Sequence, residues 1–301
     1  MLLQISPNTP VVWRTPRSLQ FGVDEAIVVL DDVDTDTERI VAALQRGVDS
    51  RYADRLATVV GAPEQTVRSL VDALGPVIER RPSAGERPTP PERHGQHGHP
   101  EQAERAGRLD RPLRVAVDGD GPTAGRLRTL LAPHADIVPV GSAVVDLAVV
   151  CAHYVIHPQR YARWLRDDVR HLPVVFGDRF ARIGPLVVPG IGPCLYCLDQ
   201  ARTDADPAWP AIASQLLTRE SPIERPLLSA ECATRTARLV LAPAAITTGA
   251  EHERQILIDA TSGEVTRLVV RPHPRCACRS LPGTATGPDA RPETAPLTRT
   301  G

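Results

Sequence analysis

The sequence contains no lysine, so its basic side chains other than histidine are all arginine, and a site that binds phosphate through lysine is excluded. It also lacks a strong net charge, which is -1 at pH 7, and this gives no electrostatic reason to expect nucleic acid or an anionic membrane as a main partner. No apolar stretch approaches the roughly 18 residues of a membrane-spanning helix, and the first residues lack the basic start and apolar core of a signal peptide. We therefore expect a cytoplasmic protein.

Four of the six cysteines form two tight pairs, Cys194-Leu-Tyr-Cys197 and Cys276-Ala-Cys278. Four thiolates from two such pairs complete a tetrahedral zinc shell. A shell of this kind has no open position for water or substrate, so the zinc would be structural and would fasten the C-terminal end to the middle of the chain. The alternatives are a redox-active pair of Cys194 and Cys197, or four unrelated thiols, and the second pair argues against both.

The other two cysteines, Cys151 and Cys232, follow a typical pattern for core packing. Cys151 closes an apolar run and Cys232 lies in an alanine-rich segment with helical spacing. Either could in principle be a nucleophile, but neither has a neighbouring base in the sequence.

Residues 1–80 alternate short strands with helices. The sequence predicts strands at 11–13, 19–21 and 26–30, with β-branched and aromatic residues between turn-like segments. It predicts a first helix after the capping-box spacing of Thr35 and Glu38, a second over 52–60, and a third from Pro63. A small sheet with three helices indicates a winged helix-turn-helix domain.

Residues 81–112 are rich in proline, glycine and polar residues, as is the segment 282–301, so we expect a disordered linker and a disordered tail. Between them, residues 113–281 alternate strands and helices, which predicts an α/β, Rossmann-like domain with a mostly parallel sheet and helices on both faces. Its strands are expected at 113–117, 137–140, 144–152, 172–176 and 186–188. A hairpin over 256–258 and 265–270 would carry the second cysteine pair back toward the first.

A glycine loop, Gly119-Asp120-Gly121-Pro122-Thr123-Ala124-Gly125, follows the first strand of this domain and approximates a nucleotide-binding fingerprint. However, Pro122 removes a backbone donor, and Asp118 and Asp120 bring negative charge to the place where phosphate would lie. We therefore expect the loop to keep the fold geometry without ATP. If a nucleotide did bind, Gly119, Gly121 and Arg126 would be its contacts.

Several motifs together resemble one family; they are Gly184-Pro185-Leu186-Val187-Val188-Pro189-Gly190, Gly192-Pro193-Cys194-Leu195-Tyr196-Cys197-Leu198-Asp199, Asp206-Pro207-Ala208-Trp209-Pro210, Gln215-Leu216 and His273-Pro274-Arg275-Cys276-Ala277-Cys278. The chain resembles the ThiF-like adenylyltransferase superfamily. More narrowly, it resembles the cyclodehydratase-associated ThiF-like proteins of thiazole/oxazole-modified peptide (bacteriocin) biosynthesis. The resemblance implies an N-terminal domain that binds the leader of a precursor peptide, a separate YcaO-type enzyme that uses ATP, and a homodimer.

The chain departs from the adenylating members of that superfamily, which need a lysine at the triphosphate and an aspartate for magnesium. Residues 152–156, where that aspartate is expected, contain no carboxylate. The sequence therefore favours a non-catalytic leader-peptide-binding scaffold. The alternative is an ATP-dependent adenylyltransferase that activates a carboxylate, and a housekeeping role outside peptide biosynthesis also stays open.

An extended leader could add a strand to the edge formed by Val28, Val29 and Leu30 and place side chains against the third helix. The helix residues expected to contact the peptide are Val67, Leu70 and Val71. The simpler reading is that these apolar residues form the core of a small domain. DNA binding is disfavoured, because residues 1–80 hold twelve acidic side chains against eight arginines.

Overall fold

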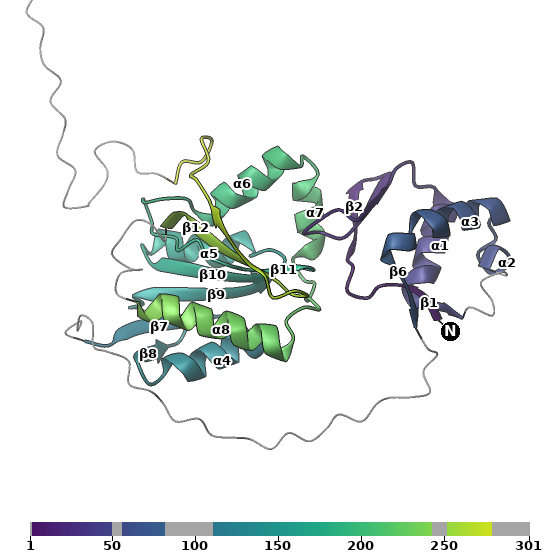
Figure 1. Cartoon of the computed structure of the whole chain (residues 1–301). Helices are drawn as coiled ribbons and strands as arrows, with labels where there is room; N and C mark the ends of the chain where they lie inside the picture. The colour runs from purple at the N-terminus through teal and green to yellow at the C-terminus, as the bar shows by residue number, and fades with distance from the viewer. Residues whose placement is uncertain (1, 50–55, 82–110, 243–251, 279–301) are drawn as a thin grey trace, which may run out of the picture.

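The computed structural model describes residues 2–49, 56–81, 111–242 and 252–278 (Figure 1). We call residues 2–81 the N-terminal unit and residues 111–278 the C-terminal unit. Most of the expected linker, the whole expected tail and the start of the expected second helix lie outside the described residues. No helix in the described ranges is both long and apolar enough to cross a membrane.

The N-terminal unit contains two three-stranded antiparallel sheets, where the sequence predicted one. The three expected strands form the sheet with the order β2-β3-β4. The second sheet, with the order β5-β1-β6, pairs the first residues of the unit with its last. The strands are β1 (Leu2–Ile5), β2 (Val11–Thr15), β3 (Ser18–Phe21), β4 (Val28–Leu30), β5 (Val48–Asp49) and β6 (Ile78–Arg81).

Three α-helices of this unit lie where the pattern predicted them: α1 (Thr35–Arg46), α2 (Leu56–Val60) and α3 (Glu64–Ala73), followed by the short 3-10 helix η2 (Gly75–Val77). Ile40, Val41 and Leu44 of α1 are buried, as their spacing predicted. The expected capping box was wrong in one respect. The residue that caps α1 is Asp34, whose side chain accepts a hydrogen bond from the Thr37 backbone N–H at 2.8 Å, and a carboxylate at this position also suits the helix dipole.

The C-terminal unit is built on a mixed sheet of seven strands in the order β13-β12-β11-β10-β9-β7-β8. Strands β8, β7, β9 and β10 are parallel, and β11, β12 and β13 continue the sheet in antiparallel fashion. The strands are β7 (Leu113–Asp118), β8 (Ala135–Val138), β9 (Leu147–His153), β10 (Arg170–Phe176), β11 (Phe180–Ile183), β12 (Arg254–Asp259) and β13 (Val265–Val269). The predicted hairpin is present as β12 and β13.

The expected strand at 186–188 was wrong, and β11 takes its place next to β10. Val187 makes only an isolated bridge to His171, and Val188 makes one to Ile191. Pro185 and Pro189 flank the segment and have no N–H to donate to a strand ladder, which explains why its pairing with β10 is limited to the two backbone hydrogen bonds between Val187 and His171.

Helices cover both faces of the sheet, as predicted (Figure 1). On one face, α4 (Pro122–Leu131) and α8 (Pro226–Leu241) pack against β7, β9 and β10 in a core that includes Leu127, Val149 and Val174. On the other face, α5 (Pro158–Arg166) and α6 (Leu195–Ala205) contribute Trp164 and Cys197 to a second core. Strand β9 is buried except at its last residue, His153, as expected for a continuous apolar run in a parallel sheet covered on both faces.

The two units meet where the sheet of β2, β3 and β4 packs against α7 (Trp209–Leu216). Val12 on this face of β2 joins a cluster with Tyr154 and Ile212 of the C-terminal unit. The opposite face of the same sheet, which includes Leu19 and Phe21, packs on the core of the N-terminal unit. The sheet is therefore covered on both faces.

Polar contacts fix the two units to each other. The Asp178 carboxylate accepts hydrogen bonds from the backbone N–H groups of Val23 and Asp24, both at 2.8 Å. In return, the Asp24 carboxylate accepts hydrogen bonds from the backbone N–H groups of Arg179 and Phe180, at 2.8 and 2.7 Å. We call this reciprocal arrangement the aspartate clasp. It ties the turn between β3 and β4 to the turn between β10 and β11.

Candidate functional site

The four paired cysteines converge as their spacing predicted. Their sulfur atoms all lie within 4.8 Å of one another, with Cys194 Sγ 3.6 Å from Cys276 Sγ and Cys197 Sγ 3.5 Å from Cys278 Sγ. Cys194 is the N-cap of α6 and Cys197 lies in its first turn, while the other pair follows β13. A cluster of this composition and size could hold a metal ion, and four thiolates are the ligands of structural zinc sites.

The segment that carries the second cysteine pair is also fastened to α6 by polar contacts. His273 Nδ1 accepts the backbone N–H of Arg275 at 3.2 Å, so its Nε2 carries the hydrogen in the neutral ring and donates it to Asp204 Oδ2 at 2.9 Å. Arg275 pairs with the same carboxylate. Because Asp204 and Cys197 lie on one helix, these contacts hold the two halves of the cluster in register.

A cleft of about 660 Å³ opens at the carboxyl ends of β7 and β9. It is lined by the start of the glycine loop, the end of β9, residues 217–220 and Glu224. The strand order reverses here, since the chain passes from β7 to β8 on one side and then to β9 on the other. In open α/β sheets, ligands bind at such a switch point.

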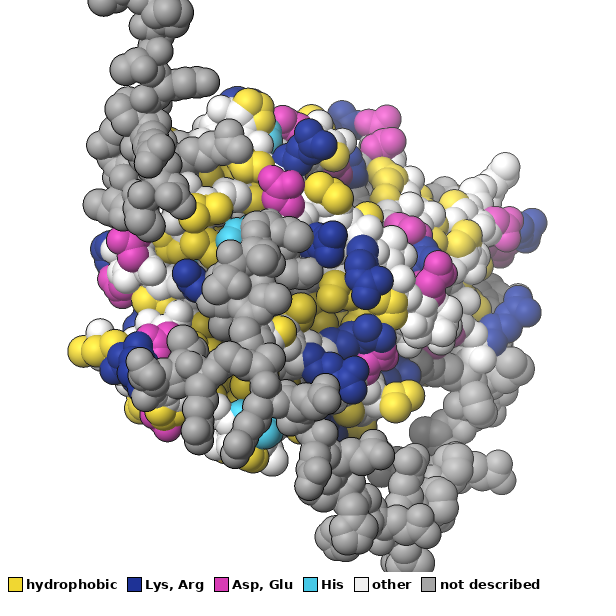
Figure 2. Space-filling model, turned by 60° about the vertical axis from the view of Figure 1, so that its left-hand side comes forward, with side chains coloured by type: hydrophobic (Ala, Val, Ile, Leu, Met, Phe, Trp, Pro, Cys, Tyr) yellow, Lys and Arg dark blue, Asp and Glu magenta, His cyan; other side chains and the backbone are white. Residues whose placement is uncertain are grey.

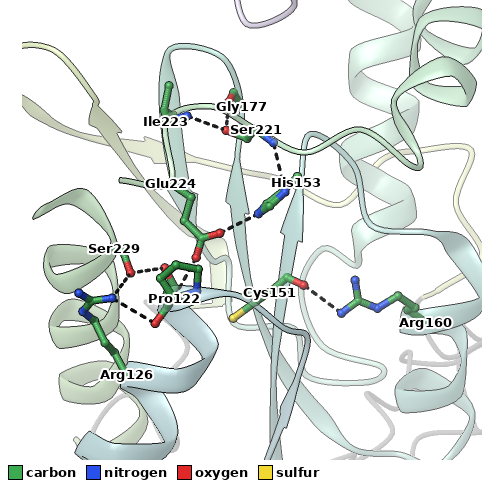
Figure 3. Close-up of polar contacts among 11 residues, drawn as sticks. Pro122, Arg126, Cys151, His153, Arg160, Gly177, Ser221, Ile223, Glu224 and Ser229 are labelled. Carbon is green, nitrogen blue, oxygen red and sulfur yellow. Dashed lines mark hydrogen bonds and ion pairs between the residues drawn. The ribbon is translucent and has the colours of Figure 1, made fainter. Parts of the chain in front are cut away.

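The glycine loop lines this cleft through Gly119 and Gly121, but Arg126 points elsewhere. Its guanidinium donates to Ser229 Oγ at 3.2 Å, between α4 and α8 (Figure 3). Arg128 lines the cleft instead and donates to the carbonyl oxygens of Val117 and Gly119, at 3.0 and 2.8 Å. Of the three residues proposed for a nucleotide, the structure brings together only the two glycines.

The carboxylate nearest the start of α4 belongs to Glu224, which the sequence did not single out. Its Oε1 accepts the backbone N–H of Thr123 at 2.8 Å, and its Oε2 lies 2.8 Å from His153 Nε2 (Figure 3). Asp118, which was expected to repel an anion here, is instead paired with Arg160 at 2.8 Å and accepts from the Trp164 indole. Glu224 is about a hundred residues from the loop, and no local pattern marks it.

The ionisation of this network follows from its geometry. Burial alone would raise the pKa of Glu224, but hydrogen bonds from His153 and Thr123 outweigh it, so the pKa lies below the ordinary value. His153 Nδ1 accepts the backbone N–H of Ser221 at 3.1 Å, so the neutral ring carries its hydrogen on Nε2 and donates it to Glu224. Both ring nitrogens are occupied, and His153 therefore has no free nitrogen to act as a general base.

Cys151 and Cys232 are buried, as their core-packing interpretation predicted. Burial raises the pKa of each thiol to about 12. A thiol that stays protonated at neutral pH is a poor nucleophile, so neither residue supports covalent catalysis.

The strand edge proposed for a peptide is exposed in part. Val29 of β4 is 40% exposed, whereas Val28 and Leu30 pack partly against the core of the N-terminal unit. Val67 and Leu70 of α3 are buried in that core, and Val71 packs against it. Val67 and Leu70 are therefore core residues of the N-terminal unit. Among the six residues proposed to contact a peptide, Val29 is the most exposed.

The surface carries mixed charge. On the face shown in Figure 2, arginine side chains gather near the middle with hydrophobic side chains between them, and acidic side chains lie both beside them and toward the edges. Such a face lacks the uniform basic character typical of nucleic-acid binding.

No family model and no curated protein matches the chain. It is similar to several solved structures. One is the E. coli microcin synthetase McbBCD complex, with 12% identity and a TM-score of 0.43 over 92% of this chain and 100% of that one. Another is E. coli MccB with ATP, with 11% identity and a TM-score of 0.41 over 93% and 100%. A third is a heterocyclase in complex with substrate and cofactor, with 14% identity and a TM-score of 0.44 over 92% of this chain but only 39% of that one. At such identities and TM-scores the similarity carries no argument about family or function.

Proposed function

We propose that the chain is a non-catalytic partner of a YcaO-type cyclodehydratase, and that its N-terminal unit binds the leader of a precursor peptide. In this proposal the N-terminal unit is the peptide-recognition domain, and the C-terminal unit is a ThiF-like scaffold that docks the enzyme. The observation that carries the proposal is the state of the two edges of the sheet β2-β3-β4.

One edge of this sheet is blocked. The side-chain amide of Gln215 accepts the Trp13 backbone N–H at 2.9 Å and donates to the Trp13 carbonyl at 2.8 Å. It therefore occupies the hydrogen-bonding groups that a neighbouring strand would use. The opposite edge, β4, has no strand beyond it among the described residues. An extended peptide can pair there through its main chain, which gives affinity without a deep pocket.

The position of β4 also suits selection of side chains. Val28 and Leu30 point toward the core of the N-terminal unit, and Val29 lies on the face that continues toward the C-terminal unit. Because side chains alternate along a strand, an added peptide would present every second residue to each of the two units. The aspartate clasp would hold both surfaces in a fixed relation.

Zinc is part of the proposal as a structural ion. Cys194, Cys197, Cys276 and Cys278 would be its four ligands, with no position left for substrate. The ion would join α6 to the segment after β13 and so complete the scaffold. We further propose that the protein acts as a homodimer, as the resemblance implies.

The rival function, an adenylyltransferase, receives little support from the cleft. The chain has no lysine, His153 has both ring nitrogens engaged, and Glu224 lies at the start of the helix that would receive phosphate. A pyrophosphate-exchange assay on the purified protein tests this function directly. Sustained, substrate-dependent exchange would overturn the non-catalytic proposal.

Peptide binding is tested by looking for a short precursor encoded beside the gene; if one is found, its leader is labelled with fluorescein and titrated with the full-length chain. Val29→Asp places a charge on the open edge, which disfavours the addition of a strand, and is expected to weaken binding at least about tenfold, or about 1.4 kcal/mol. The matched control is Val59→Asp on α2, because Val59 is also an exposed valine of the N-terminal unit, at 75%. Equal binding by both variants and the unmodified chain would place the peptide elsewhere.

A further inference from the structure

The cleft at β7 and β9 has the position of a phosphate site, but its anion-binding groups are already used. The backbone turns at Gly121, with a φ of 94°, and α4 begins at Pro122. Pro122 has no N–H, so the next residue, Thr123, offers a backbone donor at the helix start. Glu224 accepts that donor at 2.8 Å.

The fit of Glu224 against the loop is close. A β-carbon on Gly121 would lie 3.1 Å from Glu224 Oε2 and 3.5 Å from Oε1. The Glu224 side chain is only 5% exposed, and its second oxygen is held by His153. The carboxylate therefore rests on the loop backbone in the place where an oxygen of a bound phosphate would approach.

The remaining charges of the cleft do not favour a phosphate either. Four carboxylates line it, from Asp118, Asp120, Glu220 and Glu224, against the guanidinium groups of Arg128, Arg160 and Arg219. Arg160 is paired with Asp118 and Arg128 donates to backbone carbonyl oxygens, so both already have protein partners. An incoming phosphate would meet a buried negative charge next to the N-terminus of α4, which would otherwise stabilise it.

From this arrangement we infer that Glu224 is a specificity-determining residue that serves as a built-in anion and excludes phosphate ligands from the cleft. The inference concerns the cleft alone and goes beyond peptide binding at β4. It implies that the Glu224 carboxylate, in addition to the absence of lysine, would oppose binding of a nucleotide at the glycine loop. Removal of that carboxylate should create an anion site from Thr123 N–H and His153.

The test measures binding of inorganic pyrophosphate, without metal, to the full-length chain by isothermal titration calorimetry. Glu224→Ala is expected to tighten binding at least about tenfold, which is within the range of a charge at a helix N-terminus. Glu224→Gln keeps the acceptor for Thr123 N–H and removes the charge, so a smaller gain is expected and the shape of the site is preserved. Glu220→Ala is the control, because it removes another carboxylate that lines the cleft and is expected to change affinity by less than about twofold.

Each outcome decides the matter. Tighter pyrophosphate binding by the Glu224 variants, with the Glu220 variant unchanged, supports the inference. It is overturned if the unmodified chain already binds pyrophosphate as tightly, if the Glu224 variants fold but gain nothing, or if Glu220→Ala gains as much. Glu224→Gln decides the question should Glu224→Ala fail to fold. Binding of the precursor peptide is measured in parallel and should be the same in all three variants. Failure of this inference therefore shows in pyrophosphate binding, and failure of the proposed function shows in peptide binding.

Discussion

Replacing Asp24 by alanine is expected to undo the contact between the two units. The Asp24 side chain is only 3% exposed, and its Oδ1 pairs with Arg182 Nη1 at 2.6 Å, while its Oδ2 accepts the two backbone N–H groups of the clasp. The substitution leaves the Arg182 guanidinium, 14% exposed, without this partner. Breaking a buried pair on one side costs about 3 to 5 kcal/mol.

That cost falls on the docking of the units, because the pair crosses from one to the other. Two measurements report this cost. The free energy of unfolding in urea should fall, and amide hydrogen exchange at Arg179 and Phe180 should become markedly faster. Arg17→Ala is the matched control, because it breaks a surface pair without placing alanine at Asp32, whose backbone φ is 53°. Asp32 pairs with Arg17 on the surface, where the side chains are 82% and 73% exposed, and such a pair contributes at most about 1 kcal/mol. If Asp24→Ala costs no more than the control and leaves exchange unchanged, the clasp does not couple the units.

Three further predictions concern other parts of the chain. Cys197→Ser is expected to lose bound zinc in a metal analysis and to lower Tm by roughly 5 °C or more, at about 2 to 4 °C per kcal/mol. Cys232→Ser, the control, is expected to keep the metal. The prediction is contradicted if the unmodified protein folds without zinc, or if Cys197→Ser has an unchanged Tm. Backbone hydrogen bonds, of which that from Ser262 has the largest effect, lower the pKa of Asp259 to about 2. The stability that Asp259 contributes is therefore complete above the unfolded pKa near 3.8 and is lost as pH falls toward 2. The free energy of unfolding in urea should fall in this way between about pH 5 and 2, and Asp259→Asn should reduce this pH dependence. Gln215→Ala should raise amide exchange at Trp13, and no change there would mean that the side-chain amide is not needed to protect β2.

The sequence predicted the features that repeat within a short stretch of chain. The apolar run of β9, the stripe of α1 and the hairpin of β12 and β13 are all set by neighbours a few residues apart, and they lie where expected. The convergence of the two cysteine pairs was also predicted, because the short spacing within each pair lets both of its thiols face one metal position.

The features that the sequence did not reveal depend on distant contacts. Strand β1 pairs with β6 across more than seventy residues, and Glu224 meets Thr123 across about a hundred. Neither Glu224 nor Asp178 stands in a motif, and each acquires its role only when the fold brings a backbone N–H to it. The missing strand at 186–188 has the opposite cause: its apolar residues suit a strand, but the prolines on either side cannot supply the ladder.

The side-chain amide of Gln215 has a consequence for how the protein behaves at high concentration. A sheet with two exposed edge strands can pair with another molecule at each edge, and repeated pairing of this kind produces polymers. Gln215 of α7 occupies the backbone groups of Trp13 on the β2 edge, so a further strand can be added to the sheet β2-β3-β4 only at β4. Growth beyond that strand would require a second free edge on the added molecule. The β4 edge can therefore accept one added strand, while the closed β2 edge opposes polymerisation through this sheet.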